Sequence, residues 1–186
     1  MRITILNFSG RKNGNCHGIA QVVCAALAGH VLSLSEMHDM EIAPCGKCDY
    51  ECFRENTACP YAGDNLIGIY KAICTADLAI YIVPNYCDYP CAHFFAFNER
   101  SQCFFQNAPE KLDAYLQVKK KFIVVSNTGK ENFLQAFQYH VEDGMPPDTL
   151  FLAAKEYGKS SINGDLTDSV DAMRAVAGFV RGVNDI

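Results

Sequence analysis

Short apolar segments alternate along the chain with segments in which hydrophobic residues recur every three or four positions. The apolar segments predict strands, because near-continuous runs such as LAIYIV and FIVVS are typical of strands that are covered on both faces. We expect five strands, over residues 2–8, 31–35, 77–83, 121–126 and 149–154.

The segments between these strands predict amphipathic helices. The first helix has one apolar face, made of Cys16, Ile19, Ala20, Val23 and Leu27; the next has Leu66, Ile69 and Ile73; the last has Leu166, Val170, Met173, Ala177 and Val180. Asp64 and Asp165 precede the second and the last of these faces, and we expect them to cap those helices. Strands that alternate with helices predict right-handed crossovers and a parallel sheet with helices on both faces.

The chain has 186 residues and is expected to form one domain, residues 1–186. The formal net charge of −5 argues against binding to nucleic acid or to an anionic membrane surface. No apolar stretch approaches the length of a membrane span, and the chain begins with a strand-like segment rather than a signal peptide. These features predict a cytoplasmic protein.

The loop SGRKNGNC, residues 9–16, joins the first strand to the first helix. In a parallel α/β sheet, ligands bind beyond the carboxyl ends of the strands, where the first N–H groups of a helix lack partners. Gly10 and Gly14 let the backbone approach a ligand, and Arg11 adds positive charge. The loop therefore predicts a site for a phosphate monoester, with an ordinary polar turn as the alternative. The chain has neither a G-x-G-x-x-G motif nor a nucleoside-triphosphate loop.

Three stretches resemble the flavodoxin-like NAD(P)H-dependent FMN reductases: ITILNFSGRKNGNC at the start, ADLAIYIVPNY at residues 76–86 and KKKFIVVSNTGKEN at residues 119–132. The resemblance implies a flavodoxin-like three-layer sandwich with a five-stranded parallel sheet in the order 2-1-3-4-5. It also implies FMN as the cofactor, NAD(P)H as the electron donor, and a quinone, a flavin or another small acceptor.

The resemblance also implies which residues hold FMN. Those near its phosphate are Ser9, Arg11, Asn13, Asn15 and Cys16, and those beside the ring are Pro84, Asn85, Tyr86, Cys87, Asn127, Thr128 and Gly129. No acid–base catalytic residue is required, because the cofactor carries the redox chemistry. The chain departs from the family at Phe8 and Gly10, where relatives often have Gly and Pro, and at Cys16, which replaces a hydroxyl residue.

Four of the ten cysteines, Cys45, Cys48, Cys52 and Cys59, lie close together in an insertion at about residues 42–63. Such close quartets are common ligand sets for iron–sulfur clusters or zinc, because thiolates in short loops can converge on one centre. Free thiols, or a reversible Cys45–Cys48 pair, are the alternatives. The placement resembles iron–sulfur flavoproteins of the same superfamily, which implies a [4Fe–4S] cluster, although the spacing between the second and third cysteines is one residue longer here.

Three functions follow from these observations. The first is an FMN-dependent reductase, and the second is an electron carrier in which FMN and a cluster exchange electrons with a ferredoxin-like partner. The third is an interaction module without flavin, which the departures at Phe8, Gly10 and Cys16 leave open. The aromatic-rich stretch HFFAFNERSQCFF, residues 93–105, predicts core packing and, beyond that, an association surface for a homodimer or homotetramer.

Overall fold

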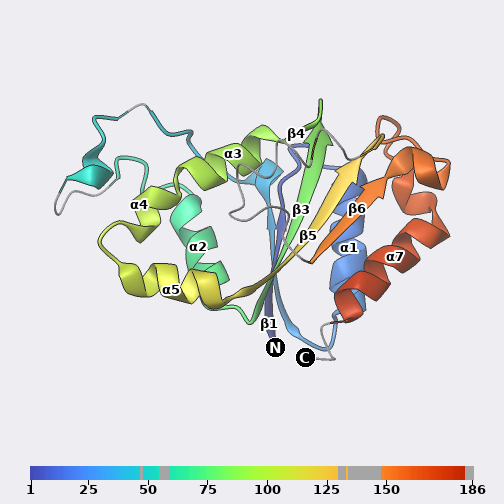
Figure 1. Ribbon diagram of the computed structural model, residues 1–186, viewed down its shortest axis with the longest axis horizontal. Helices are drawn as coiled ribbons and strands as arrows, with labels where there is room; N and C mark the ends of the chain where they lie inside the picture. The colour runs from blue at the N-terminus through green and yellow to red at the C-terminus, as the bar shows by residue number, and fades with distance from the viewer. Residues whose placement is uncertain (47, 55–58, 130–132, 134–147, 183–186) are drawn as a thin grey trace.

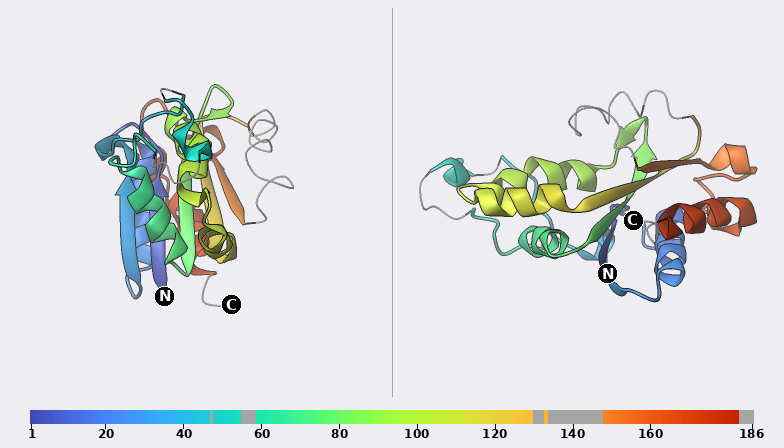
Figure 2. Two further views of the ribbon diagram at one scale, coloured as in Figure 1. Left: turned by 90° about the vertical axis from the view of Figure 1, so that its left-hand side faces the viewer. Right: turned by 60° about the horizontal axis from the view of Figure 1, so that its bottom comes forward.

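A parallel β-sheet runs through the middle of the protein and carries helices on both faces (Figures 1 and 2). The computed structural model describes residues 1–46, 48–54, 59–129, 133 and 148–182. The strands lie in the order β2 (Val31–Glu36), β1 (Arg2–Asn7), β3 (Leu78–Tyr86), β5 (Lys119–Ser126) and β6 (Thr149–Ala153), and neighbouring strands are parallel. When the short antiparallel strand β4 (Tyr89–Pro90) is left out, these five strands, numbered along the chain, lie in the predicted order 2-1-3-4-5. The predicted fold class is therefore confirmed. Strand β4 pairs antiparallel with the end of β3 and was not predicted.

The helices form two separate layers. One layer holds α1 (Asn15–Ala26) and α7 (Val170–Arg181); the other holds α2 (Leu66–Cys74), α3 (Ala92–Glu99), α4 (Ser101–Phe105) and α5 (Pro109–Gln117). Short 3-10 turns occupy η1 (Met37–Asp39), η2 (Glu51–Phe53), η3 (Ala154–Tyr157) and η4 (Leu166–Asp168). Within the described part of the chain, every helix falls short of the length and apolarity needed to cross a lipid bilayer.

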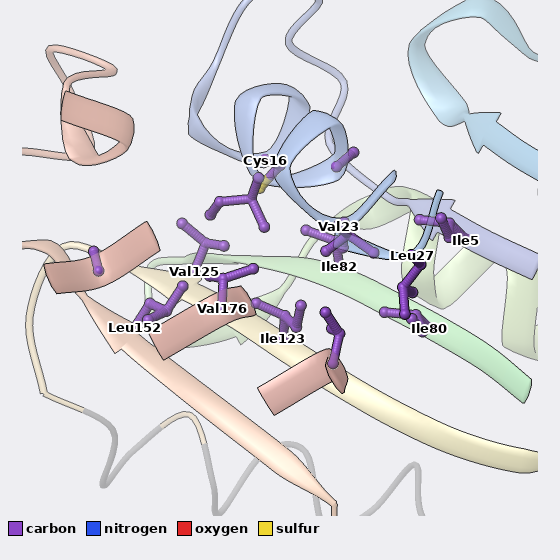
Figure 3. Close-up of a cluster of buried hydrophobic side chains, with 14 of the residues drawn as sticks. Ile5, Cys16, Val23, Leu27, Ile80, Ile82, Ile123, Val125, Leu152 and Val176 are labelled. Carbon is purple, nitrogen blue, oxygen red and sulfur yellow. The ribbon is translucent and has the colours of Figure 1, made fainter. Parts of the chain in front are cut away.

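Successive residues of the central strand β3 enter opposite layers of the core. Ile80 and Ile82 pack towards α1 and α7, in the cluster that Figure 3 shows with Val23, Ile123 and Val176. Tyr81 and Val83 pack towards the other helical layer. This alternation follows from strand geometry, because consecutive side chains point to opposite faces of a sheet. A strand that is apolar at every position is therefore buried on both sides.

The second layer is built around aromatic rings. Phe97 is buried between Tyr70 and Phe8, with ring centroids at 4.4 Å and 5.4 Å from its own. Phe94 and Phe104, from the same aromatic-rich stretch, are also buried in this layer. These side chains serve the core of a single chain and are not available to a partner. The homodimer or homotetramer stays a prediction.

The last helix begins later than the sequence pattern predicts. The hydroxyl of Ser169 accepts a hydrogen bond from the backbone N–H of Ala172 at 3.3 Å, so Ser169 is the N-cap of α7. The prediction that Asp165 caps this helix is wrong, because its carboxylate accepts the N–H of Ser160 at 2.7 Å and closes the preceding loop instead. Leu166 lies in η4, yet it is buried in the predicted apolar layer.

Ile80 provides a test of the core between β3 and the α1–α7 layer. Its side chain is fully buried, so Ile80→Ala should leave a cavity and lower the free energy of unfolding by about 3 kcal/mol. Val170→Ala is the control, because Val170 is 71% exposed at the start of α7 and should change stability by less than about 0.5 kcal/mol. Urea denaturation followed by circular dichroism measures both, and equal losses would contradict the described packing.

Candidate functional site

A cavity of about 620 Å³ lies at the carboxyl edge of the sheet, where the segments after β1, β3, β5 and β6 converge. Parallel strands bring their carboxyl ends to the same edge, which explains why segments far apart in the sequence meet here. The cavity is lined by Ser9, Arg11, Gly14, Asn15, Cys16, Pro84, Asn85, Tyr86, Cys87, Val125, Asn127, Ser161 and Ile162.

Most of the predicted FMN residues line this one cavity; Asn13, Thr128 and Gly129 are not among the lining residues. The cavity is also lined by Ser161 and Ile162, which follow β6 and were not predicted from the sequence. The stretch that contains them has glycine and serine residues typical of a loop, but no local pattern shows that it reaches the first loop.

The departures at Phe8 and Gly10 do not close the cavity. The Phe8 side chain is fully buried in the aromatic layer and is not among the residues that line the cavity. Gly10 packs against His93, whose ring would lie 3.1 Å from a Cβ atom at this position. His93 in turn is held by the backbone oxygen of Phe8, 3.2 Å from its Nδ1. A side chain at this position would therefore need the His93 ring to shift by a few tenths of an ångström.

The first loop is folded by its own short polar side chains. The carboxamide oxygen of Asn7 accepts the N–H of Ser9 at 3.0 Å, and the hydroxyl of Ser9 accepts the N–H of Arg11 at 3.1 Å. Gly14 is the N-cap of α1 and has no side chain to cap the helix. Among the described residues no side chain caps the amino end of α1, and helix N-termini of this kind bind anions through their first N–H groups.

Arg11 ties the first loop to the segment after β6. Its guanidinium donates to the backbone oxygen of Ser161 at 3.2 Å and to that of Ile162 at 3.5 Å. The N–H of Ser161 donates to the side-chain oxygen of Asn127 at 3.0 Å, which adds the segment after β5 to the same network. These bonds hold three lining segments in fixed relation to one another.

Three buried polar atoms at the cavity have no hydrogen-bond partner among the described residues: Asn15 Nδ2, Asn85 Oδ1 and Ser161 Oγ. The Asn15 side chain is oriented by the N–H of Leu166, which donates to its Oδ1 at 3.0 Å and leaves the amide N–H₂ unpaired. Asn85 is oriented in the same way, because its Nδ2 donates to the hydroxyl of Ser126 at 3.0 Å. Buried polar atoms without partners are costly, so a donor, an acceptor and a hydroxyl left in one cavity indicate a polar ligand.

A tight hairpin carries Tyr86 and Cys87 to the cavity. Cys87 and Asp88 have positive φ values of 53° and 66°, and they connect Tyr86 to its antiparallel partner Tyr89. Two consecutive left-handed residues are the geometry of a type I′ turn, which more often contains Asn and Gly. Burial raises the pKa of the Tyr86 hydroxyl. The hairpin brings Tyr86 to the same cavity that Ser9 of the first loop lines.

The two buried thiols near the cavity are kept protonated. Burial raises the pKa of Cys16 far above its ordinary value, and the neighbouring Cys91 raises it further. Burial also raises the pKa of Cys91 to about 11, and its Sγ lies 3.1 Å from the backbone oxygen of Phe8. Cys87, in contrast, is exposed.

A second polar centre lies around Arg100. Here the cysteine-rich segment, at about residues 42–63, meets the helical layer that holds α2, α3, α4 and α5. The side chain of Arg100 is fully buried and forms an ion pair with Asp64. The guanidinium also donates to the backbone oxygens of Ala43 at 3.1 Å and Tyr61 at 3.2 Å, and to the sulfur of Cys59 at 3.6 Å. Arg100 therefore contacts the cysteine-rich segment near both of its ends, at Ala43 and at Tyr61.

The predicted metal ligands Cys45, Cys48, Cys52 and Cys59 all belong to this segment, which extends beyond α4 in Figure 1. In the part of the chain that the structure describes, no group of three or more His, Cys, Asp or Glu side chains is placed to hold a metal ion. Metal binding by the four cysteines stays a prediction.

Thiol reactivity gives a direct test of the cavity's environment. At pH 8 iodoacetamide should alkylate Cys87 in the native protein and spare Cys91, since a pKa of about 11 leaves only about one thiolate in a thousand. Cys16 should also be spared because it is buried. Peptide mass spectrometry measures the labelling, and protein unfolded in guanidinium is the control in which all ten cysteines should react. Comparable rates at Cys87 and Cys91 in the native protein would contradict the structure.

The buried ion pair makes a second prediction. Asp64→Asn should lower the free energy of unfolding by about 3 kcal/mol, because it leaves the Arg100 charge buried without its carboxylate. Asp171→Asn removes a carboxylate from an exposed pair with Arg174 and should cost less than about 0.5 kcal/mol. Thermal and urea unfolding measure the difference, and a stable Asp64→Asn variant would count against the ion pair as an anchor.

The sequence matches no protein-family model and no curated protein. The fold, however, matches solved structures over nearly the whole chain. The structure of RosB with a bound intermediate, 8-demethyl-8-formylriboflavin-5′-phosphate, has a TM-score of 0.68 at 14% identity, covering 97% of this chain and 76% of RosB. The NAD(P)H:quinone oxidoreductase from Methanothermobacter marburgensis has a TM-score of 0.62 at 12% identity, covering 96% of this chain and 97% of the other.

A third match is FerB from Paracoccus denitrificans, described as a flavoenzyme NAD(P)H:(acceptor) oxidoreductase. Its TM-score is 0.54 at 13% identity, and the match covers 99% of this chain and 97% of FerB. At such low identities these similarities bear on the fold. The chain has the flavodoxin-like α/β fold, which it shares with RosB, with the NAD(P)H:quinone oxidoreductase and with the flavoenzyme FerB.

Proposed function

We propose that the protein is an FMN-dependent oxidoreductase that takes electrons from NAD(P)H and passes them to a quinone, a flavin or another small acceptor. The observation that carries this proposal is the cavity at the carboxyl edge of β1, β3 and β5, with its three buried polar atoms that lack partners. Its volume of about 620 Å³ lies within the range of cofactor sites.

The first loop suits the phosphate of FMN. The uncapped amino end of α1 offers backbone N–H groups, and Arg11 contributes a positive charge. The unpaired N–H₂ of Asn15 is a donor that a phosphate oxygen would satisfy. Cys16 lines the same region, and because its thiol is a weak donor, the backbone and Asn15 would carry most of the hydrogen bonding.

The segment from Pro84 to Cys87 suits the ring. Pro84 and Val125 are buried and give the cavity an apolar wall, and the unpaired oxygen of Asn85 would accept a hydrogen bond from an N–H group such as the ring imide. The hydroxyl of Ser161 would pair with the ribityl chain or the phosphate. The residues present therefore fit FMN.

When bound, FMN supplies two-electron transfer between a reduced nicotinamide and an acceptor. The task of the chain is then to bind and orient the cofactor, and no acid or base among the lining residues has to transfer a proton to substrate. Arg11, Asn127 and Ser161 hold three segments together around the cavity. The hairpin that pairs Tyr86 with Tyr89 positions the fourth segment.

The solved structures of similar fold support the same proposal. The RosB structure holds a riboflavin 5′-phosphate derivative, and the other two matches are named as NAD(P)H-dependent oxidoreductases for a quinone or an unspecified acceptor. An electron carrier with an iron–sulfur cluster would need a metal centre, and no observation on the described residues favours one. The acceptor, the homodimer or homotetramer and the cytoplasmic location stay predictions.

A titration with FMN tests the proposal. We expect purified protein to quench the fluorescence of added FMN with one site per chain, and the loaded protein to oxidise NADH or NADPH when a soluble benzoquinone is added. Protein that takes up no FMN would overturn the cofactor assignment. Protein that binds FMN but oxidises neither nicotinamide would overturn the reductase assignment and leave the binding site standing.

Asn15→Asp tests the phosphate end of the cavity. The carboxylate keeps the oxygen that accepts from Leu166 and replaces the unpaired N–H₂ with a negative charge, so it should repel a phosphate. We expect the dissociation constant for FMN to rise at least about tenfold, equivalent to about 1.4 kcal/mol. Asn107→Asp, on an exposed residue outside the cavity, makes the same charge change and should leave FMN binding unaltered. Equal affinities of all three proteins would contradict the assignment.

A further inference from the structure

Asn7 and Glu36 are the last residues of β1 and β2, and they lie opposite each other in the parallel register of the sheet. The Nδ2 of Asn7 donates a hydrogen bond to Oε2 of Glu36 at 2.9 Å. The other end of the same amide, Oδ1, accepts the N–H of Ser9 at 3.0 Å. Asn7 is fully buried, so its amide connects Glu36 to the first loop from inside the protein.

The carboxylate of Glu36 determines which end of the Asn7 amide faces the first loop. An ionised carboxylate can only accept hydrogen bonds, so Asn7 turns its N–H₂ group towards it. The amide oxygen then faces the backbone N–H of Ser9, which is buried and needs an acceptor. The hydroxyl of Ser9 in turn accepts the N–H of Arg11. The orientation of one buried amide therefore sets the hydrogen bonds that fold the loop.

Two histidines hold Glu36 from other elements. Nδ1 of His17, in the first turn of α1, lies 3.0 Å from Oε1 of Glu36, and Nδ1 of His38, in η1, lies 3.2 Å from Oε2. Nε2 of His38 lies 3.2 Å from a carboxylate oxygen of Asp39, which also pairs with Lys12 of the first loop at 3.7 Å. The side chain of Glu36 is 14% exposed and that of His38 is 7% exposed, so water screens their attraction incompletely.

We propose that Glu36 is a positioning residue for the phosphate end of the cavity. Through Asn7 it fixes the first loop in the conformation that receives a phosphate monoester. The proposal rests on the proposed function, because it takes FMN as the ligand of this loop. Glu36 is not among the residues that line the cavity, so it acts on the ligand through the loop.

A carboxylate beside an anion site also needs compensating charge. The titratable groups around Glu36 come from three elements: Lys12 in the first loop, Cys16, His17 and Cys24 on α1, and His38 and Asp39 in η1. Burial raises the pKa of both thiols, which therefore stay neutral. The cluster is net negative when both imidazoles are neutral and net positive when both are protonated. The two histidines therefore decide whether the carboxylate repels a phosphate.

The sign of the effect of Glu36→Gln separates positioning from simple repulsion. Glutamine keeps the shape but offers both a donor and an acceptor, so it no longer imposes one orientation on the Asn7 amide. We expect the dissociation constant for FMN to rise about tenfold, although a negative charge near the phosphate is removed. Riboflavin, which lacks the phosphate, should bind both proteins equally. Glu110→Gln, on an exposed residue of α5, makes the same charge change and should leave both constants unaltered.

Trypsin provides a readout that needs no flavin. Arg11 and Lys12 are exposed in the first loop, and trypsin cleaves after both types of residue. We expect Glu36→Gln to raise the rate of cleavage at these two sites about fivefold, because the loop opens more often. Lys71, an exposed residue of α2, is the internal reference site and should be cleaved at the native rate. Mass spectrometry of the fragments measures all three rates.

The histidines add a dependence on pH. An imidazole loses its proton as the pH rises from about 5 to about 8, so a higher pH removes the positive charge that holds and compensates Glu36. We expect the dissociation constant for FMN to rise between about pH 6.5 and about pH 8.5 by a factor about threefold larger in the native protein than in His17→Gln. Titration of the FMN phosphate is common to both proteins. His30→Gln, before β2 at the opposite edge of the sheet, should keep the native profile.

The outcomes distinguish this proposal from the proposed function. Native protein that takes up no FMN would overturn the proposed function. An unchanged trypsin rate in Glu36→Gln would overturn the role of Glu36 whether or not FMN binds. Equal or tighter FMN binding by Glu36→Gln, or an equal loss of affinity for FMN and riboflavin, would also overturn it. Identical pH profiles of native protein and His17→Gln would do the same, and that comparison does not require Glu36→Gln to fold.

Discussion

The burial of β3 on both faces is the constraint on which the rest of the structure depends. Its odd and even side chains enter different helical layers, and its backbone pairs with β1 on one side and β5 on the other. A shift of one residue would exchange Tyr81 and Ile82 between an aromatic layer and an aliphatic one, so the register is strongly determined. Because Pro84, Asn85 and Tyr86 belong to the same strand, the position of the cavity wall follows from the packing of the core.

The hydrophobic pattern along the chain was sufficient to predict the five parallel strands, because near-continuous apolar runs are typical of buried strands. Their order in the sheet was predicted from the resemblance to the flavodoxin-like reductases. Features that depend on long-range backbone contacts were not predicted from the sequence. Ser161 and Ile162 reach the cavity through hydrogen bonds with Arg11 and Asn127, and such bonds leave no periodic signal. The hairpin at Cys87 and Asp88 was missed because its turn lacks the Asn-Gly pair by which such turns are recognised.

The cysteines show the same limit in another form. Spacing along the chain groups Cys45, Cys48, Cys52 and Cys59, but it cannot reveal that the sulfur of Cys59 lies 3.6 Å from the guanidinium of Arg100. Arg100 decides the arrangement, because a buried guanidinium must be surrounded by acceptors and draws together Asp64, two backbone oxygens and the sulfur of Cys59. Nothing in the sequence around residue 100 marks it as buried, since arginine is usually exposed.

Arg11 is satisfied by backbone oxygens, which are neutral, and no ion pair found among the described residues includes it. Its full positive charge therefore acts on the cavity although the chain as a whole is acidic. The local field points against the overall field, so an anionic ligand is repelled at long range and attracted near the mouth. Added salt should shorten the range of the repulsion by the net charge and of the attraction by Arg11. The association rate of an anionic ligand would then depend on the balance of these two interactions more than on the net charge.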